Sequence, residues 1–358
     1  MKTSGTYLRV LAGIILTGSL LAQQTGEFER LGQASMTFLD IDVGARAVGM
    51  GSAFTCVDND VNTIFWNPAG VASIRGGMLS LSSCRWIADM NQYALAAAYG
   101  TDRAGVFGVS LLYMDNGEIE RTIPNRPFDE HPEEYESFPE GYQIDGTYMV
   151  QQWAAGISYA RQITDKFSVG GQIRYCYEDL GATDVAVPTY DDSTGKFSGF
   201  ESAEGVGNRE GVFALDFGTL YYFGFKDLRI GMSLRNFAQG VTYAFETFSL
   251  PRIYKVAIAM DVLSLISGMD NHDLQVMFVT VSPHDGGDRV HLGCEYTFRN
   301  LLVLRGGYRS DADIGALSAG FGLTPSAFGD LNLHFDYAYS DAEQVFGSIH
   351  RFSFGFSF

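Results

Sequence analysis

The chain has 358 residues and a formal net charge of −18, and only 18% of its residues are charged, below the ~25% that is typical of soluble domains. Glycine is abundant at 42 residues, and the aromatic residues include 27 phenylalanines and 19 tyrosines. Because phosphate contacts need lysine and arginine, this acidic balance argues against a nucleic-acid partner.

The first 22 residues have the pattern of a secretory signal peptide. Lys2 and Arg9 give a positive start, residues 10–21 are apolar, and small residues favour cleavage after Ala22. The alternative is a membrane anchor, but the apolar run is shorter than the ~20 residues that a spanning helix needs. We therefore predict an exported protein.

The next segment, residues 23–76, is rich in Gly, Ala, Asp and Asn and shows little alternation. Its glycines permit close backbone approach and positive φ, and the Asn-Pro pair favours a turn. We predict that this segment plugs or lines the lumen of a barrel, or alternatively that its WNPAG run only begins the first strand. The candidate residues of the plug motif are Arg46, Gly49, Gly51, Trp66, Asn67 and Pro68.

The runs over residues 44–47, 49–51 and 65–70 carry a family resemblance. The block over 40–72 resembles the N-terminal region of the PorV/PorQ family of outer-membrane proteins, which is similar in turn to the long-chain fatty-acid transporter (FadL) superfamily. The first resemblance implies a type IX secretion factor that binds the signal domains of exported cargo proteins. The second implies a transporter that moves hydrophobic small molecules through a lateral opening.

From residue 77 to residue 358 the chain alternates between apolar and polar positions. In the last segment, four phenylalanines at 352, 354, 356 and 358 alternate with small or charged residues, so one face of the strand is wholly aromatic. A lipid-facing exterior and a wet lumen require this division, because charge at mid-bilayer is costly. The predicted lumen-facing polar residues are Arg174, Glu295, Arg305, His334 and Asp336.

We predict an all-β protein, a transmembrane antiparallel barrel of about 14 strands in a Gram-negative-type outer membrane, surrounded by lipid. The expected strands are 77–83, 92–99, 104–114, 150–161, 166–178, 211–223, 227–237, 252–263, 272–282, 289–298, 301–309, 315–323, 331–339 and 348–358. Tyrosines and a tryptophan near their ends predict aromatic girdles at Tyr93, Tyr99, Tyr113, Trp153, Tyr159, Tyr221, Tyr222, Tyr254 and Tyr308.

Long connections at 115–149, 179–210 and 238–251 alternate with short turns, which places the long loops outside the cell and both termini in the periplasm. The first two loops hold seventeen acids and four bases. A solvated, repelling surface explains them, and calcium binding near residues 191–195 is a weaker alternative.

The remaining reactive residues form no recognisable active site. The four cysteines match no zinc spacing, although a bridge between Cys56 and Cys84 is one alternative. The histidines show no HExxH spacing, and neither a GxSxG motif nor a phosphate loop occurs. We predict no enzyme activity, no catalytic residue, no cofactor and no metal site.

Three functions remain open. The first is a non-enzymatic secretion or surface-translocation factor that binds exported proteins or secretion-system components, and a polar lumen favours it. The second is a transporter of hydrophobic small molecules, for which glycine pairs at 170–171 and 306–307 would mark a weakened wall. The third is a soluble secreted β protein.

Overall fold

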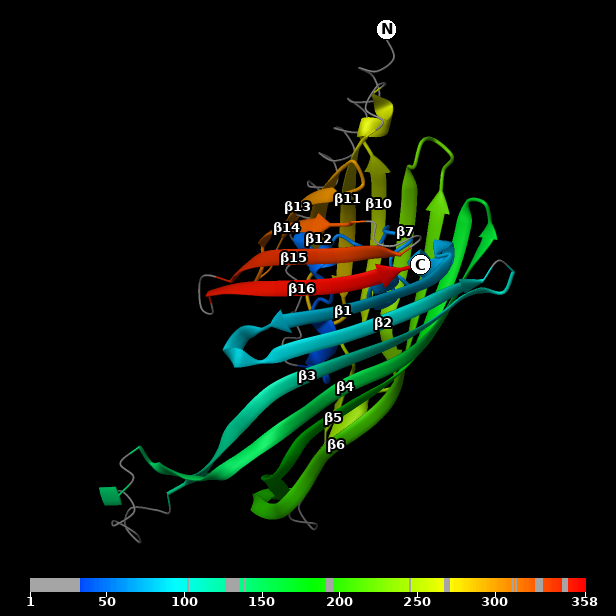
Figure 1. The fold of residues 1–358 in the computed structure, drawn as a ribbon. Coiled ribbons are helices and arrows are strands. Elements are labelled where there is room, and N and C mark those ends of the chain that lie inside the picture. Colours follow the sequence, from blue (N-terminus) through cyan, green and yellow to red (C-terminus); the bar gives the residue numbers. More distant parts are fainter. Residues whose placement is uncertain are drawn as a thin grey trace.

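The computed structural model describes residues 33–101, 103–125, 136–137, 140–190, 196–244, 246–266, 271–310, 312, 314–325, 331–342 and 347–358. Within these residues, fourteen antiparallel strands form one closed barrel, which confirms the predicted fold (Figure 1). Its strands are β1 (Gly76–Arg85), β2 (Asn91–Thr101), β3 (Gly105–Pro124), β4 (Tyr142–Thr164), β5 (Phe167–Tyr190), β6 (Phe197–Tyr222), β7 (Arg229–Ala238), β10 (Ile253–Asp261), β11 (His272–Pro283), β12 (Arg289–Phe298), β13 (Leu302–Arg309), β14 (Leu317–Leu323), β15 (Asn332–Ala342) and β16 (Gly347–Ser357).

The barrel closes where its first strand meets its last. The ladder between β1 and β16 runs from Met78 opposite Ser357 to Arg85 opposite His350, and β2 pairs with the other edge of β1. Closure leaves no free strand edge in the wall, which hydrocarbon would not tolerate.

The two faces of the wall differ as the alternation predicted. Phe352 and Phe354 on β16 are 44% and 53% exposed, whereas Arg351 and Ser353 on the same strand are 2% and 3% exposed. The phenylalanines therefore lie on the outer surface, and the polar residues face the interior. A closed barrel with an apolar outer belt is built to lie in hydrocarbon, so the chain is an outer-membrane β-barrel.

Most of the predicted girdle residues lie on the outer surface. Tyr93, Tyr99, Tyr254 and Tyr308 are among those whose side chains are exposed. The prediction is wrong for Tyr222, which is only partly exposed and whose hydroxyl donates to Asp58 Oδ2 at 2.5 Å. The phenol therefore joins the wall to the N-terminal segment rather than to lipid headgroups.

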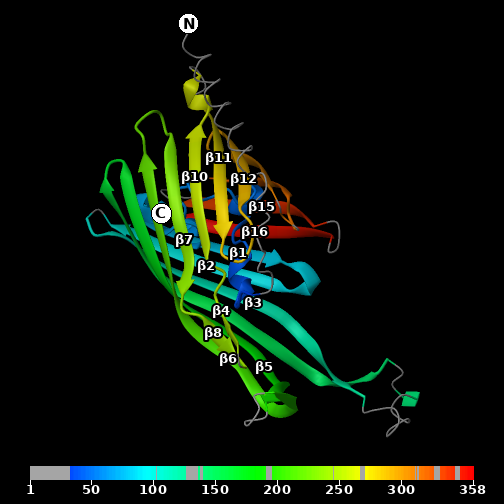
Figure 2. The ribbon, with the colours of Figure 1, turned by 180° about the vertical axis from the view of Figure 1, so that it is seen from behind.

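Four strands continue well beyond their predicted ends. The structure extends β3 to Pro124 and β4 back to Tyr142, and it extends β5 and β6 in the same way, so the expected loops 115–149 and 179–210 are in part strand. Pairing between β4 and β5 stops at Gln151 opposite Asp179. Beyond that point β3–β4 and β5–β6 are separate hairpins that project past the barrel at the end of the long loops (Figures 1 and 2).

Short elements complete the described chain. The N-terminal segment holds η1 (Thr37–Asp40), α2 (Ala45–Gly49), η2 (Val61–Phe65) and η3 (Pro68–Ser73), and other short helices are η4 (Ile87–Asp89) and η5 (Leu263–Leu265). The expected loop 238–251 contains a small hairpin of β8 (Val241–Tyr243) and β9 (Glu246–Phe248). Among the described residues, none of the helices has the length and apolar character needed to cross a membrane.

The four cysteines are free thiols, so the Cys56–Cys84 bridge is absent. The predicted signal peptide, 1–22, and the weak calcium candidate at 191–195 lie outside the described residues. Among the residues that are described, no three His, Cys, Asp or Glu side chains are grouped as metal ligands.

The outer belt makes a first prediction. Phe354→Arg places a charge near the middle of β16 on the lipid face and should lower the free energy of unfolding by about 2–4 kcal/mol. Denaturant titration of the protein refolded into vesicles measures this loss. Met149→Arg is the control, because Met149 is 64% exposed and lies beyond the last β4–β5 pair, outside the bilayer. Equal losses in both variants would contradict the assignment of the lipid belt.

Candidate functional site

The N-terminal segment folds through local caps and left-handed turns. Asn67 caps η3 by accepting a hydrogen bond from the backbone N–H of Ala69 at 3.1 Å, with Pro68 at the first helical position. Asp60 caps η2 in the same way, accepting from Asn62 N–H at 2.8 Å. Gly51 has a φ of 63°, a conformation that glycine adopts without strain. The segment is therefore a compact coil with its own hydrogen bonds.

The barrel encloses this segment. Helix α2 contacts β13–β16 on one side of the lumen, and η3 contacts β4–β6 on the other (Figure 2). Trp66 is buried, and its Nε1 donates to the carbonyl of Val43 at 3.0 Å. The Asn67 amide donates both to Thr55 within the segment and to Thr219 on β6, at 2.7 and 3.1 Å. The segment is thus bonded to the wall as well as to itself.

The N-terminal segment lies directly against glycines in the wall. A Cβ at Gly307 would lie 1.9 Å from the nitrogen of Gly51, and one at Gly218 would lie 1.8 Å from Asn67 Oδ1. Neither position has room for a side chain. The wall glycines that approach the segment closely are Gly100, Gly108, Gly170, Gly218, Gly231, Gly293, Gly307 and Gly320.

The glycine pairs at 170–171 and 306–307 do not weaken the wall as expected. Both stretches are paired without interruption with their neighbours on each side. Gly170 and Gly307 are instead the points where the segment packs directly on a strand. A register shift inside the wall does occur between β6 and β7, between Leu215 and Phe217.

A polar network closes that β6–β7 bulge. Arg174 donates to Asp216 at 2.9 Å and also contacts the side-chain oxygen of Asn236. Asp216 accepts the backbone N–H of Asn236 at 2.7 Å, and Asn236 adopts a left-handed φ of 58°. Side chains therefore supply the bonds that the ladder lacks there, and Arg174 lies inside the wall in a structural role.

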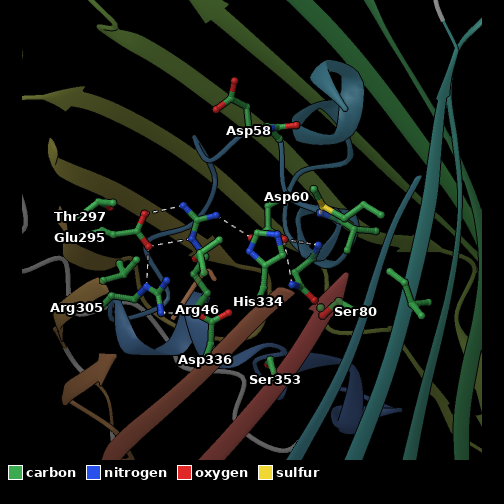
Figure 3. A pocket seen from close by; sticks show the side chains of 18 of the residues that line it. Arg46, Asp58, Asp60, Ser80, Glu295, Thr297, Arg305, His334, Asp336 and Ser353 are labelled. Atoms are coloured by element: carbon green, nitrogen blue, oxygen red, sulfur yellow. Dashed lines mark hydrogen bonds and ion pairs between the residues drawn. The ribbon is translucent and has the colours of Figure 1, made fainter. Parts of the chain in front are cut away.

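Five charged residues join the segment to the opposite wall (Figure 3). Arg46 of α2 donates twice to Glu295 on β12, at 2.6 and 2.9 Å, and once to Asp60 at 2.9 Å. Glu295 also accepts from Arg305 at 2.6 Å, and Arg305 donates to Asp336 at 2.6 Å. A two-pronged arginine–carboxylate contact fixes orientation as well as distance. Charges therefore hold the segment on the β12–β15 side.

These charges line a polar cavity of about 410 Å³ at the short-turn end of the barrel. His334 also faces this cavity, and its Nε2 lies 3.1 Å from the hydroxyl of Ser357 (Figure 3). A second cavity of about 480 Å³ shares Arg46 and Glu295. Short turns are periplasmic in bacterial barrels, so this polar space faces the periplasm.

The opposite inner wall carries no charge and is in large part apolar, which the expectation of a polar lumen missed. Ala96, Leu112 and Met114 on β2 and β3 are buried and belong to the same hydrophobic cluster as Ile64 and Trp66 of the segment. Small apolar residues on a strand give no sign of which side faces lipid. The lumen is therefore charged along β12–β16 and uncharged along β2–β4, where small and apolar residues share the inner face with Gln92, Ser110, Gln152 and Ser158.

Sequence reasoning also missed the acidic partners within the segment. Asp60 is one, and Asp42 is another, accepting from Arg309 at 2.8 Å and from the Ser52 hydroxyl at 2.5 Å. Burial alone would raise the pKa of Asp42, but Arg309, Lys255 and Ser52 hold that pKa at about 2. One feature of the sequence could have indicated these partners: the segment was expected to enter a lumen that contains arginines, and it holds more acids than bases.

Comparisons with known proteins bear on the fold. Similar solved structures include the Ralstonia pickettii toluene transporter TbuX, which is 13% identical over 88% of this chain and 97% of that chain, with a TM-score of 0.55. The Pseudomonas putida toluene transporter TodX is 14% identical over 88% and 97%, with a TM-score of 0.55. A Pseudomonas aeruginosa FadL homologue is 10% identical over 88% and 98%, with a TM-score of 0.52.

No family model matches the chain, and no curated protein matches it either. At these identities the solved structures show a shared fold. The fold is similar to that of FadL-like barrels, whereas membership of that superfamily or of the PorV/PorQ family stays a prediction.

The wall glycines make a second prediction. Gly307→Ala forces a methyl group into the backbone of Gly51. We therefore expect the free energy of unfolding to fall by about 1–3 kcal/mol and the segment to be held less firmly. Limited proteolysis of the segment from the periplasmic side measures the loosening. Gly306→Ala is the matched control, because a Cβ there would meet only Cys294 Sγ, at an ordinary 3.6 Å. Equal protease sensitivity of the two variants would show that the close contact does not hold the segment.

Proposed function

We propose that this chain is a gated outer-membrane channel for hydrophobic small molecules. The observation that carries the proposal is the uncharged and largely apolar inner wall of β2–β4, where Ala96, Leu112 and Met114 belong to the same hydrophobic cluster as the N-terminal segment. An apolar surface inside a membrane barrel has no use in a water-filled diffusion pore, whose interior is polar. The similar solved structures include a toluene transporter and a monoaromatic hydrocarbon channel, which supports the same class of solute.

The N-terminal segment is the gate in this proposal. It occupies the lumen between wall glycines on opposite sides, so a solute passes only when part of it moves. On the β12 side, movement of the segment would break the contact of Arg46 with Glu295 and leave a buried charge without its partner. On the β2–β4 side, a hydrophobic solute can replace apolar contacts with its own. The path that costs a solute the least free energy therefore runs between the segment and β2–β4.

The β6–β7 bulge is the proposed weak point of the wall. Contacts of Asn236 on β7 with Arg174 and Asp216 replace ladder bonds there. An opening between β6 and β7 breaks these contacts and leaves the buried Arg174–Asp216 ion pair intact. Phe217 and Phe237 flank the bulge on the outer surface, where they are 52% and 46% exposed. A solute that leaves at this height would enter the lipid directly.

Transport tests the proposal. We expect vesicles that contain the protein to take up toluene faster than protein-free vesicles, with uptake measured by stopped sampling of labelled toluene and of a labelled fatty acid. Arg46→Met should raise the rate roughly tenfold or more, because Glu295 keeps Arg305 as a partner while the segment loses its ion pair with β12.

Arg85→Met is the control for that experiment. Arg85 also forms an ion pair, with Asp89, but its side chain is 75% exposed at the far end of β1, so its loss should leave uptake unchanged. The proposal fails if neither solute crosses faster than it does in protein-free vesicles, with wild-type protein or with Arg46→Met.

A secretion role is the second candidate, and the projecting hairpins favour it. Ile144 and Met149 on β4 are 59% and 64% exposed beyond the last β4–β5 pair, where a partner protein could cover them. We expect an isolated β-sandwich signal domain of exported cargo to bind wild-type protein and to bind Ile144→Asp more weakly in a pull-down. Failure of every such domain of the source organism to bind would remove this candidate.

A further inference from the structure

Five cations converge at the long-loop end of the lumen. They come from five strands, each near the end that faces the cell exterior: Arg235 on β7, Lys255 on β10, Arg289 on β12, Arg309 on β13 and Arg351 on β16. The N-terminal segment brings two acids to the same level, Asp40 and Asp42, and both interact electrostatically with Lys255. The balance of this group is therefore positive.

One of these cations is neutralised by an ion pair, whereas three others are buried and lie against aromatic rings without a paired carboxylate among the described residues. Arg309 pairs with Asp42 at 2.8 Å. Lys255, Arg235 and Arg351 are 3%, 7% and 2% exposed, and among the described residues none of their side chains makes a hydrogen bond or an ion pair. The buried Nε atoms of Arg235 and Arg351 have no acceptor within the described chain.

Two of the unpaired cations share one aromatic ring. Lys255 Nζ lies 4.6 Å and the Arg235 guanidinium 6.0 Å from the centre of the Trp66 ring. The two residues lie on paired strands, since Arg235 is opposite Ile253, two residues before Lys255. A ring face attracts one cation, but it cannot neutralise two that also repel each other.

Buried charge of one sign is costly unless an opposite charge compensates for it. We propose that the lumen next to Trp66 is a binding site for an oxyanion, a carboxylate, phosphate or sulfonate group, held by Lys255 and Arg235. The anion enters from the long-loop end, where Asp40 is exposed. This inference stands apart from the transport proposal, because a lumen that passes no solute would still bind the anion.

Trp66 gives a direct readout of the site. The chain has three tryptophans, and Trp86→Phe with Trp153→Phe leaves Trp66 as the sole fluorophore. Iodide is the probe, titrated into full-length protein in a non-ionic detergent at constant ionic strength. We expect saturable quenching of Trp66, although its side chain is only 1% exposed. Acrylamide, which is neutral, should quench weakly and without saturation.

Substitutions locate the site. Lys255→Met and Arg235→Met should each weaken iodide binding about tenfold or more, because each removes a charge contact. Lys226→Met is the matched control, since Lys226 is an exposed lysine in the turn before β7 at the opposite end of the barrel. The heat-dependent shift of the barrel on gels checks that every variant is folded.

Competition separates the sources of the anion. Displacement of iodide by inorganic phosphate supports a site for free anions, whereas displacement by octanoate alone supports a site for the headgroup of an amphiphile. The displacing anion should also raise the melting temperature of wild-type protein but not that of Lys255→Met. Unsaturable quenching that is equal in wild type and Lys255→Met would overturn the proposal.

Discussion

The rest of the structure depends on the need to bond every backbone polar group that meets hydrocarbon. A sheet meets this need only by closing, and here β1 closes it by pairing with β16 along eight residues. Closure fixes an inside and an outside for every strand, so alternate residues are committed to lipid or to lumen. The exposed phenylalanines of β16 and the buried Ser353 between Phe352 and Phe354 are the direct result.

Closure also creates an interior that must be filled, and the N-terminal segment fills it by two different means. Against β12–β15 it uses ion pairs centred on Arg46, and against β2–β4 it uses packing of η2 and η3, with Ile64 close to Gly108. Glycines bring the backbone of the segment to the wall on both sides. Ion pairs fix the orientation of the segment, and packing fixes its distance from the wall. The segment would therefore separate from the two sides of the lumen in different ways, by breaking ion pairs on one side and apolar contacts on the other.

Alternation made the barrel predictable from sequence, because period-2 patterning is a local property of each strand. The same argument failed above the membrane, where β3–β6 continue without a lipid face to mark them. Within the site, Glu295 and Arg305 were assigned to the lumen from alternation alone. Their partners Arg46 and Asp60 come from a region without periodicity, and the apolar inner face of Ala96 looks like a lipid face in sequence. Contacts between distant segments decided these points.

The wall glycines have a consequence for biogenesis. The segment touches glycines on β5 and β6 as well as on β13 and β14, yet it precedes β1, the strand that seals the barrel. A closed barrel that fits the segment this tightly would leave no room for the segment to enter after closure. The segment must therefore bind to the growing sheet before β1 pairs with β16. It then acts as a template on which this last pair of strands closes the barrel.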